Sequence, residues 1–342
     1  MRRLKTTIHP RFRSTFASMF VWFVFMAGPS LASADLGRPV TDEGPTQVYV
    51  VLFVVDLNNI DSANQEFEAN VFAHIRWTDS RLTHDGPNPV SRPWSEVWHP
   101  RIQVINQQKL WPTFPEIVEI TPDGTVVYRQ RVWGSFSQPQ DVHDFPFDTQ
   151  TFNIQLVSVG YTPDEVVLLP EPGSTSGMNS ELSVPDWKIL EWKVETGPFE
   201  VAPGARAVPG FGFSFKAERQ SGYFIVKVII PLIFIVAMSW IVFWLDPKES
   251  GTRISVSITA MLTLIAYRFA VGTSLPKVSY LTRLDNFILL STVLIFATLI
   301  EAVTTATFAK EEKLSRARAI NRWSRFLFPA VFLLVAAQFL LF

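Results

Sequence analysis

Four apolar runs, each about as long as a helix that crosses a lipid bilayer, constrain the fold of this chain more than any other feature. They cover residues 223–245, 254–275, 284–308 and 323–342. The joints between them are short and charged, which is typical of loops at a membrane surface. The sequence therefore predicts a four-helix transmembrane domain over 221–342.

The first 34 residues have the layout of a secretory signal peptide. Basic residues precede a short apolar core at 17–26, and Ala32–Ala34 form a small-residue cleavage pattern before Asp35. An uncleaved anchor is the alternative, but this apolar core is shorter than the roughly 20 residues that span a bilayer. We therefore expect a signal peptide at 1–34 and a mature chain that begins at Asp35.

Export of the N-terminal domain and the distribution of positive charge predict the same topology. A cleaved signal peptide places the domain outside the cytoplasm, and four spans return the C-terminus to that side. The third joint, 310–325, then lies in the cytoplasm, and its six Lys or Arg residues against two Glu residues follow the positive-inside rule. We expect a multi-pass protein of a bacterial inner membrane with its N-terminal domain in the periplasm.

Residues 35–220 form a polar, proline-punctuated segment that predicts an exported β-domain. Turn signals such as Asp123-Gly124 separate short runs rich in Val, Ile, Phe and Thr. These candidate strands are 47–57, 66–78, 116–121, 125–133, 150–158, 165–169, 187–195 and 211–219. About eight to ten strands with no long amphipathic helix predict an all-β, immunoglobulin-like antiparallel sandwich.

The composition excludes several kinds of chemistry. Cysteine is absent, which excludes disulfides, Cys-based zinc sites and thiol catalysis. The formal net charge of −1 leaves no basic footprint for nucleic acid. No HExxH, GxSxG or P-loop motif occurs, and the four histidines after the signal peptide form no catalytic pattern. We therefore expect neither an enzyme nor a bound metal or cofactor.

The second apolar run, taken as 252–276, carries hydroxyl groups along one face of its predicted helix. Intervals of three and four residues keep a single face, which holds Ser255, Thr259, Leu262, Ala266, Phe269 and Thr273. A face toward lipid gains nothing from Ser and Thr, whereas a water-filled path tolerates them and is closed by Leu, Ala and Phe through dewetting. The other interpretation is a buried helix whose hydroxyls bond to its own carbonyls.

Six stretches in register resemble the pentameric ligand-gated ion channels, in particular the prokaryotic members, over essentially the whole mature chain. The matching stretches are, in order, the WxDxRL strand end at 76–82, the WxP of the first binding loop at 98–100, the FPFDxQ signature turn at 145–150, Arg219 twelve residues before Pro231, the pore-lining span at 252–276 and the RxxFP opening of the last span at 325–329. Each motif alone is unspecific, but their common order predicts this family.

Two departures from the family pattern bear on function. The positions of the family's signature disulfide fall at Gln138 and Phe152, so no covalent bond closes that loop. The second binding loop, 158–161, reads SVGY and lacks the family's tryptophan, which leaves its aromatic cage incomplete.

The resemblance implies a homopentamer in a lipid bilayer, with ring-closing heterologous interfaces around a pore lined by the second span. Five Leu262 side chains and five Phe269 side chains would form two apolar constrictions, with rings of Ser255 and Thr259 below them. Ions would permeate along this path when the constrictions widen.

Charge selectivity depends on the joint before the pore helix. Asp246 and Glu249 lie at the cytoplasmic mouth, where rings of carboxylate concentrate cations. Arg253 begins the helix, and its side chain points either into the mouth or behind it. We expect a cation-selective channel. The alternative is that both acids belong to a solvated loop in which they pair with Lys248.

The resemblance places an agonist between subunits. The set of residues expected from the two faces is Ile105, Tyr161, Phe199, Phe211 and Phe213 from one subunit and Phe72, Arg76, Tyr128 and Arg131 from its neighbour. Aromatic rings suit an amine through cation–π attraction, and arginines suit a carboxylate. Protons are a further possible agonist, although no histidine lies in any predicted span.

Coupling between the domains is expected from a charge cluster at their boundary. Its members are Asp61 in a strand turn, Phe147 and Asp148 in the signature turn, Arg219 ahead of the first span, and Pro276 and Lys277 after the pore helix. The alternative is that the Arg219–Asp148 pair only holds the fold, and both roles are compatible.

Two other classes of protein remain open from the sequence. A membrane-anchored periplasmic ligand-binding receptor without a conducting pore would have the same domain order, but it does not need a hydroxyl stripe in register with an apolar gate. A secondary transporter would show paired repeats and broken helices, and neither pattern occurs in the sequence.

Overall fold

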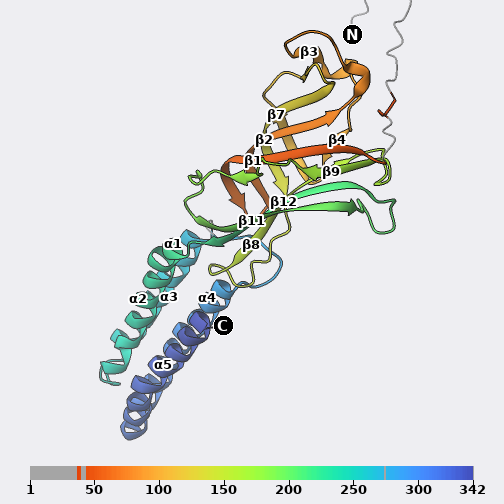
Figure 1. Ribbon diagram of the computed structural model, residues 1–342. Coiled ribbons are helices and arrows are strands. Elements are labelled where there is room, and N and C mark those ends of the chain that lie inside the picture. The colour runs from red at the N-terminus through yellow and green to blue at the C-terminus, as the bar shows by residue number, and fades with distance from the viewer. Residues whose placement is uncertain (1–36, 40–43, 273–274, 342) are drawn as a thin grey trace, which may run out of the picture. The chain divides into compact units, whose positions relative to one another are not determined.

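The computed structural model describes residues 37–39, 44–272 and 275–341, and all structural statements below refer to them (Figure 1). The predicted signal peptide at 1–34 lies outside the described residues. A β-sandwich comes first along the chain and four long helices follow it.

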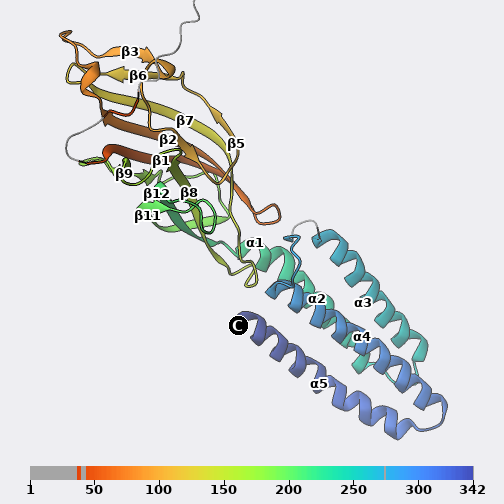
Figure 2. The same cartoon turned by 90° about the vertical axis from the view of Figure 1, so that its right-hand side faces the viewer.

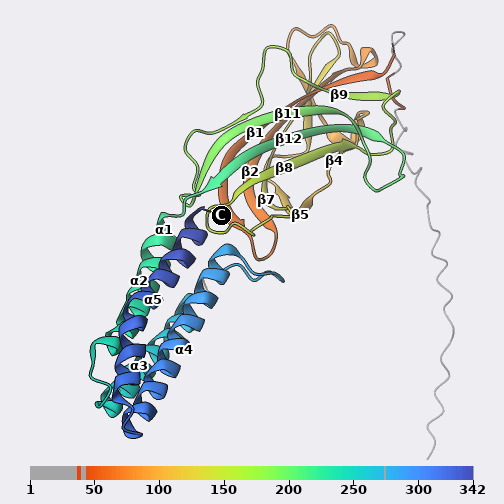
Figure 3. The same cartoon turned by 90° about the horizontal axis from the view of Figure 1, so that it is seen from below.

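Twelve strands in two sheets build the sandwich within the described residues. They are β1 (Thr46–Asp61), β2 (Glu66–Thr78), β3 (Val90–Pro93), β4 (Ile102–Val104), β5 (Gln107–Pro112), β6 (Ile117–Ile120), β7 (Thr125–Ser137), β8 (Thr149–Ser158), β9 (Val166–Pro170), β10 (Gly177–Met178), β11 (Trp187–Phe199) and β12 (Val208–Arg219). The larger sheet has the order β10-β1-β2-β7-β6-β3, with β5 on β7 and β9 on β1 (Figure 2). The smaller sheet has the order β11-β12-β8-β4 (Figure 3).

The expected sandwich is confirmed, with one difference in strand direction. All pairs are antiparallel except those of β9 and β10, which run parallel to β1. The sequence did not predict β3, β4, β5 or β10, because these strands have two to six residues and little of the apolar alternation that marks a half-buried strand.

Alternating apolar side chains of the two sheets meet in the core. The ring of Phe67 on β2 lies 5.1 Å from that of Phe136 on β7, and it reaches Phe152 and Phe215 of the opposite sheet at 5.3 and 5.7 Å between ring centroids. Aromatic pairs at such distances add about 0.5–1.5 kcal/mol each beyond the area they bury. These contacts join the two sheets into one unit.

The described residues contain four helical segments long and apolar enough to cross a membrane. The first, Gly222–Trp244, is made of α1 (Gly222–Phe224), a π-helical turn, α2 (Ile230–Ser239) and a 3₁₀ turn. The others are α3 (Ser250–Val271), α4 (Arg283–Lys310) and α5 (Leu314–Leu341). Pro231 follows the π-helical turn, since proline supplies no backbone N–H and clashes with the preceding turn of a regular helix.

The helices pack through apolar faces, and α4 contacts α2, α3 and α5 (Figure 2). A capping box starts α4, in which Thr282 Oγ1 accepts the backbone N–H of Asp285 at 3.1 Å and the Asp285 carboxylate accepts that of Thr282 at 3.1 Å. The last helix begins at Leu314 rather than at 323, because its first turns are charged and hydropathy alone does not detect them.

Candidate functional site

One face of α3, called the stripe below, is exposed in the single chain and carries Ser255, Thr259, Leu262, Ala266 and Phe269. Leu262 and Phe269 are 61% and 80% exposed, whereas Ala260 and Leu264 of the same helix are fully buried against the bundle. Ser255, Thr259 and Ala266 are exposed with them, and Thr273 lies outside the described residues. The Thr259 hydroxyl donates to the carbonyl of Ser255 at 2.8 Å, so it is satisfied within its own helix while it stays on the open face.

Two carboxylates before α3 are exposed, whereas the arginine in the first turn of α3 is buried. Asp246 and Glu249 are exposed, and the nearest basic partner of Asp246 is Arg318 at 3.9 Å. Arg253 is 0% exposed and points away from the stripe into the helical bundle. Of the two orientations that the sequence left open for this side chain, the structure contains the one behind the stripe.

Arg219 and Asp148 form a buried ion pair where β12 ends. Arg219 Nε donates to Asp148 Oδ1 at 2.7 Å, and its Nη2 donates to Asp148 Oδ2 at 3.1 Å and to Ser62 Oγ at 2.9 Å. The two side chains are 8% and 2% exposed. The guanidinium also lies over the ring of Trp187 at 4.2 Å and over that of Phe145 at 4.9 Å. Two of the six expected coupling residues are therefore in direct contact.

Asp61 does not join this ion pair in the described residues, which corrects the expected cluster. Its carboxylate accepts the backbone N–H groups of Ala63 at 2.8 Å and Asn64 at 3.0 Å and so closes its own turn. Burial acts to raise the pKa of Asp61, but the hydrogen bonds from Asn64 and Ala63 outweigh it and lower that pKa. The neighbouring Ser62 contacts Arg219 instead, because the Asp61 carboxylate already accepts the backbone N–H groups of its own turn.

A cavity of about 250 Å³ lies between this turn and the segment after α3. It is lined by Asn59, Ile60, Asp61, Ser62, Ala63, Phe145, Arg219, Phe224, Leu275 and Pro276. Arg219 and Pro276 therefore both line this cavity, whereas Lys277 is exposed and does not line it.

The signature turn is hydrogen-bonded to the start of α4, which sequence reasoning missed. The backbone N–H of Arg283 donates to the carbonyl of His143 at 2.7 Å, and that of Leu284 donates to the carbonyl of Phe145 at 3.2 Å. The His143 ring stacks on Tyr280 at 3.9 Å. No residue pattern signals such contacts, because they are backbone bonds between segments far apart in the chain.

Phe147 of the same turn packs among side chains of the helices. Its ring lies 5.5 Å from that of Phe339 on α5 and 5.1 Å from the guanidinium of Arg283 on α4. The turn thus contacts both α4 and α5, so a displacement of the turn would change its packing against both helices.

Three of the expected agonist residues are occupied by contacts within the sandwich, two in its core and one in an ion pair. Phe211 and Phe213 are fully buried in the sandwich core, so their rings do not reach the surface where a neighbour would meet them. Arg76 donates three hydrogen bonds of 2.7–3.0 Å to the carboxylate of Glu171, and its guanidinium lies over the ring of Tyr49. The expectation that these three side chains face a ligand is therefore corrected.

The remaining expected residues divide between the two sheets. Tyr161 accepts the indole N–H of Trp98 at 2.8 Å, and Ile105 is 36% exposed at the edge of the smaller sheet. On the larger sheet, Tyr128 packs on Trp94 at 4.1 Å between ring centroids and Arg131 Nε donates to Asn70 at 2.8 Å. Phe72, also on this sheet, is half-buried near Phe114.

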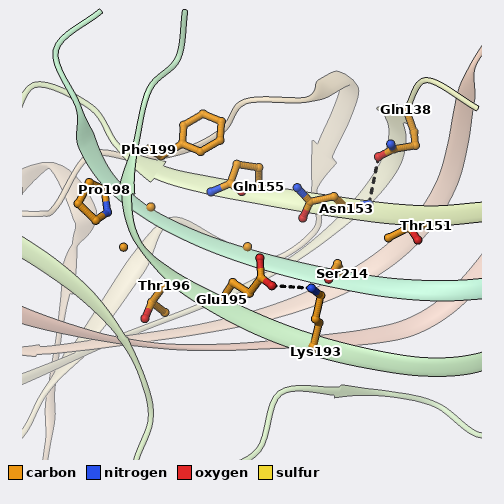
Figure 4. A pocket seen from close by; sticks show the side chains of 13 residues that line it. Gln138, Thr151, Asn153, Gln155, Lys193, Glu195, Thr196, Pro198, Phe199 and Ser214 are labelled. Carbon is orange, nitrogen blue, oxygen red and sulfur yellow. Dashed lines mark hydrogen bonds and ion pairs between the residues drawn. The ribbon is translucent and has the colours of Figure 1, made fainter. Parts of the chain in front are cut away.

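A second cavity, of about 500 Å³, lies on the outer face of the smaller sheet and includes the predicted residue Phe199 (Figure 4). Side-chain amides and hydroxyls line it, from Gln138, Thr151, Asn153, Gln155, Thr196 and Ser214, together with the ion pair of Lys193 and Glu195. Such a surface offers many donors and acceptors to a polar molecule. The signal for it was the run of polar residues that alternate with apolar ones along β8 and β12.

Comparison with known proteins places the chain in a family. Residues 34–203 match the family model of the neurotransmitter-gated ion-channel ligand binding domain, and residues 228–313 match that of the neurotransmitter-gated ion-channel transmembrane region. The chain therefore belongs to the neurotransmitter-gated ion-channel family, and it is a ligand-gated ion channel rather than an enzyme. It is a membrane protein with a ligand-binding domain outside the cytoplasm, as expected for the inner membrane of a bacterium.

The chain is also similar to a characterised relative. It is 28% identical over 300 residues to a proton-gated ion channel of Gloeobacter violaceus (strain ATCC 29082 / PCC 7421), which covers 86% of this chain and 82% of the relative. The absence of cysteine in the sequence means that this member lacks the signature disulfide. The family resemblance read from the motifs is confirmed.

Proposed function

We propose that this chain is one subunit of a homopentameric, cation-selective channel whose pore is lined by α3 and opened by an agonist that binds between subunits. The observation that carries the proposal is the open stripe of α3, since a single chain packs the opposite face of this helix and leaves Leu262 and Phe269 uncovered. Five copies around an axis would cover that stripe and enclose a path.

The stripe supports a gate of the hydrophobic type. Rings of Leu262 and Phe269 would exclude water from a narrow segment, and rings of Ser255 and Thr259 would keep the segment below it wet. Small outward movements of the helices would widen the apolar rings enough for water and ions to enter.

The charges near the start of α3 support cation selectivity. Asp246 and Glu249 are exposed, so five copies of each would concentrate cations at the mouth. The nearest positive charge on α3, that of Arg253, is buried on the other face of the helix.

The agonist site would combine Ile105, Tyr161 and Phe199 of one subunit with Phe72, Tyr128 and Arg131 of the next. Aromatic side chains predominate in this reduced set, which favours a cationic amine over a dicarboxylate. A second candidate is the proton, because the relative that covers most of the chain is a proton-gated channel.

Transmission from ligand to pore would use the contacts at the domain boundary. The Arg219–Asp148 pair ties β12 to the signature turn, and the signature turn is bonded to the start of α4. The cavity that holds both Arg219 and Pro276 brings the segment after α3 to the same place.

Electrical recording of the purified protein in a planar bilayer tests the proposal. We expect unitary currents that appear on a drop in pH or on addition of an amine, and a reversal potential that follows the cation gradient in asymmetric KCl. A protein that binds ligand and stays electrically silent would be a membrane-anchored receptor without a pore. Reversal near the chloride potential would reject cation selectivity and keep the channel.

A further inference from the structure

A buried ionic cluster joins three helices of the transmembrane domain behind the pore helix. Arg253 of α3 donates from Nη2 to Glu301 of α4 at 2.9 Å and to Asn321 of α5 at 3.0 Å, and from Nη1 to Thr305 of α4 at 2.8 Å. The Arg253 and Glu301 side chains are 0% and 6% exposed. A charge of either sign is thus held inside the helical bundle, where an unpaired charge is strongly unfavourable.

The cluster is incompletely satisfied. Arg253 Nε and Glu301 Oε1 are buried without a hydrogen-bond partner among the described residues. A buried ion pair with unused donors and acceptors contributes little net stability, and apolar residues of similar volume often serve stability as well or better. What this pair does determine is the direction in which the guanidinium points.

That direction matters because Arg253 lies at the start of the pore helix. Two residues along an α-helix correspond to a rotation of about 200°, so a side chain at 253 lies nearly opposite one at 255. Ser255 belongs to the exposed stripe, and Arg253 is buried on the other side. The pairing with Glu301 and Asn321 holds the cation there.

The same part of α5 also holds the end of the first span. Asn321 Nδ2 donates to the carbonyl of Leu245 at 3.4 Å, and Arg325 Nε donates to the carbonyl of Phe243 at 2.8 Å. Leu245 directly precedes Asp246, one of the two acids proposed for the mouth. Asn321 therefore contacts both the buried cation and the joint that presents the carboxylates.

We propose that Glu301 and Asn321 are positioning residues that keep Arg253 turned away from the pore, so that its charge does not offset the charges of Asp246 and Glu249 at the mouth. The inference rests on the proposed cation-selective pore. Without the Glu301 carboxylate, Arg253 has no ion-pair partner among the described residues. We expect its guanidinium then to turn toward water at the mouth. Five cations would then offset the rings of carboxylate.

The test is the reversal potential of Glu301→Gln pentamers in a planar bilayer under an about tenfold KCl gradient. We expect the cation-to-anion permeability ratio to fall by about tenfold, because a ring of charge changes local ion concentration by at least that factor. Glu301→Asp should keep the wild-type value. The double variant Arg253→Gln/Glu301→Gln should restore cation selectivity, since it removes the displaced cation, and a merely structural role of Glu301 predicts no such rescue.

Glu311→Gln is the matched control, because Glu311 lies on the same cytoplasmic side but is exposed and paired with Lys313. It should leave the reversal potential unchanged. Glu301→Gln pentamers that gate with the wild-type reversal potential would overturn the inference. If that variant yields no pentamer, Asn321→Ala decides: a shift toward chloride supports the inference, and an unchanged potential overturns it. Wild-type protein that is not cation-selective would instead reject the proposed function.

Discussion

Arg219 donates two hydrogen bonds of 2.7 and 3.1 Å to Asp148, and both side chains are buried. The Arg219 guanidinium also lies over the rings of Trp187 and Phe145. The ion pair connects the last strand of the sandwich to the signature turn, 71 residues earlier in the chain. Since the first membrane helix begins three residues after Arg219, at Gly222, this contact lies on the covalent and the noncovalent route between the two domains.

Substitution of Arg219 by Ala should abolish gating or prevent assembly. Among the described residues, it leaves the buried Asp148 carboxylate with Gln150 as its one side-chain partner, and loss of one member of a buried pair costs about 3–5 kcal/mol. Agonist-evoked current and the oligomer mass of the purified variant are the measurements. Arg129→Ala is the control, because its ion pair with Glu119 is about half exposed and such pairs contribute about 0–1 kcal/mol. Wild-type gating by Arg219→Ala would remove the coupling role.

Leu262→Ser should make the channel easier to open and should raise its leak current. A smaller, polar side chain lets water occupy the proposed constriction in the closed state. The comparison is Leu264→Ala on the buried face of the same helix, which should lower stability by about 2–5 kcal/mol without a leak. Equal leak currents from both variants, or from neither, would mean that Leu262 does not face the pore.

Substitution of a core phenylalanine, Phe213, should lower stability, whereas substitution of a cavity phenylalanine, Phe199, should change the response to agonist. Phe213→Ala removes a fully buried ring and should lower the free energy of unfolding by about 3–5 kcal/mol. Phe199→Ala, at the rim of the large polar cavity, should leave the unfolding midpoint nearly unchanged and shift the agonist concentration that opens half of the channels. Denaturant titration and dose–response curves distinguish them. A destabilised Phe199→Ala variant with normal agonist response would place that ring in the core instead.

Stability should fall as the pH drops through 6.5, because the folded structure lowers the pKa values of two histidines, His74 and His99. Burial, followed by Arg101, lowers the pKa of His99, and burial, followed by Arg129, lowers the pKa of His74. Between those lowered values and the ordinary pKa of 6.5, the unfolded chain binds more protons than the folded one, so acid favours unfolding.

Thermal unfolding of the purified protein at several pH values measures this slope. His99→Gln and His74→Gln should each flatten it, and the double variant should flatten it most. An unchanged slope in the double variant would assign the acid sensitivity to other groups.

The sequence was sufficient for the features that depend on residue composition between turn signals and on apolar length. Runs rich in Val, Ile, Phe and Thr located eight of the twelve strands in the described residues, and apolar length located the four helices. The burial of Phe211 and Phe213 was also readable, because with Phe215 they alternate with Gly212 and Ser214 along β12. The family resemblance drew attention to their aromatic character instead.

What the sequence did not predict depends on partners distant in the chain. Glu171 engages Arg76 across 95 residues, and Glu301 engages Arg253 across 48. Neither ion pair produces a periodic pattern in the sequence. The structure was therefore needed to show that the Arg76 guanidinium is paired and that the Arg253 side chain points behind the stripe. Asp61 differs, because its carboxylate is consumed by its own turn, as is common for Asp at such positions.

The most direct test of the central proposal, a pore lined by the open stripe of α3, uses the absence of cysteine from the chain. Thr259→Cys and Ser257→Cys introduce one thiol each, the first on the exposed stripe and the second on the buried face. A charged, water-soluble methanethiosulfonate reagent applied to open channels should irreversibly reduce the current of Thr259→Cys and leave that of Ser257→Cys unchanged. Modification of Ser257→Cys with an unaffected Thr259→Cys would contradict the assignment of the pore to this face.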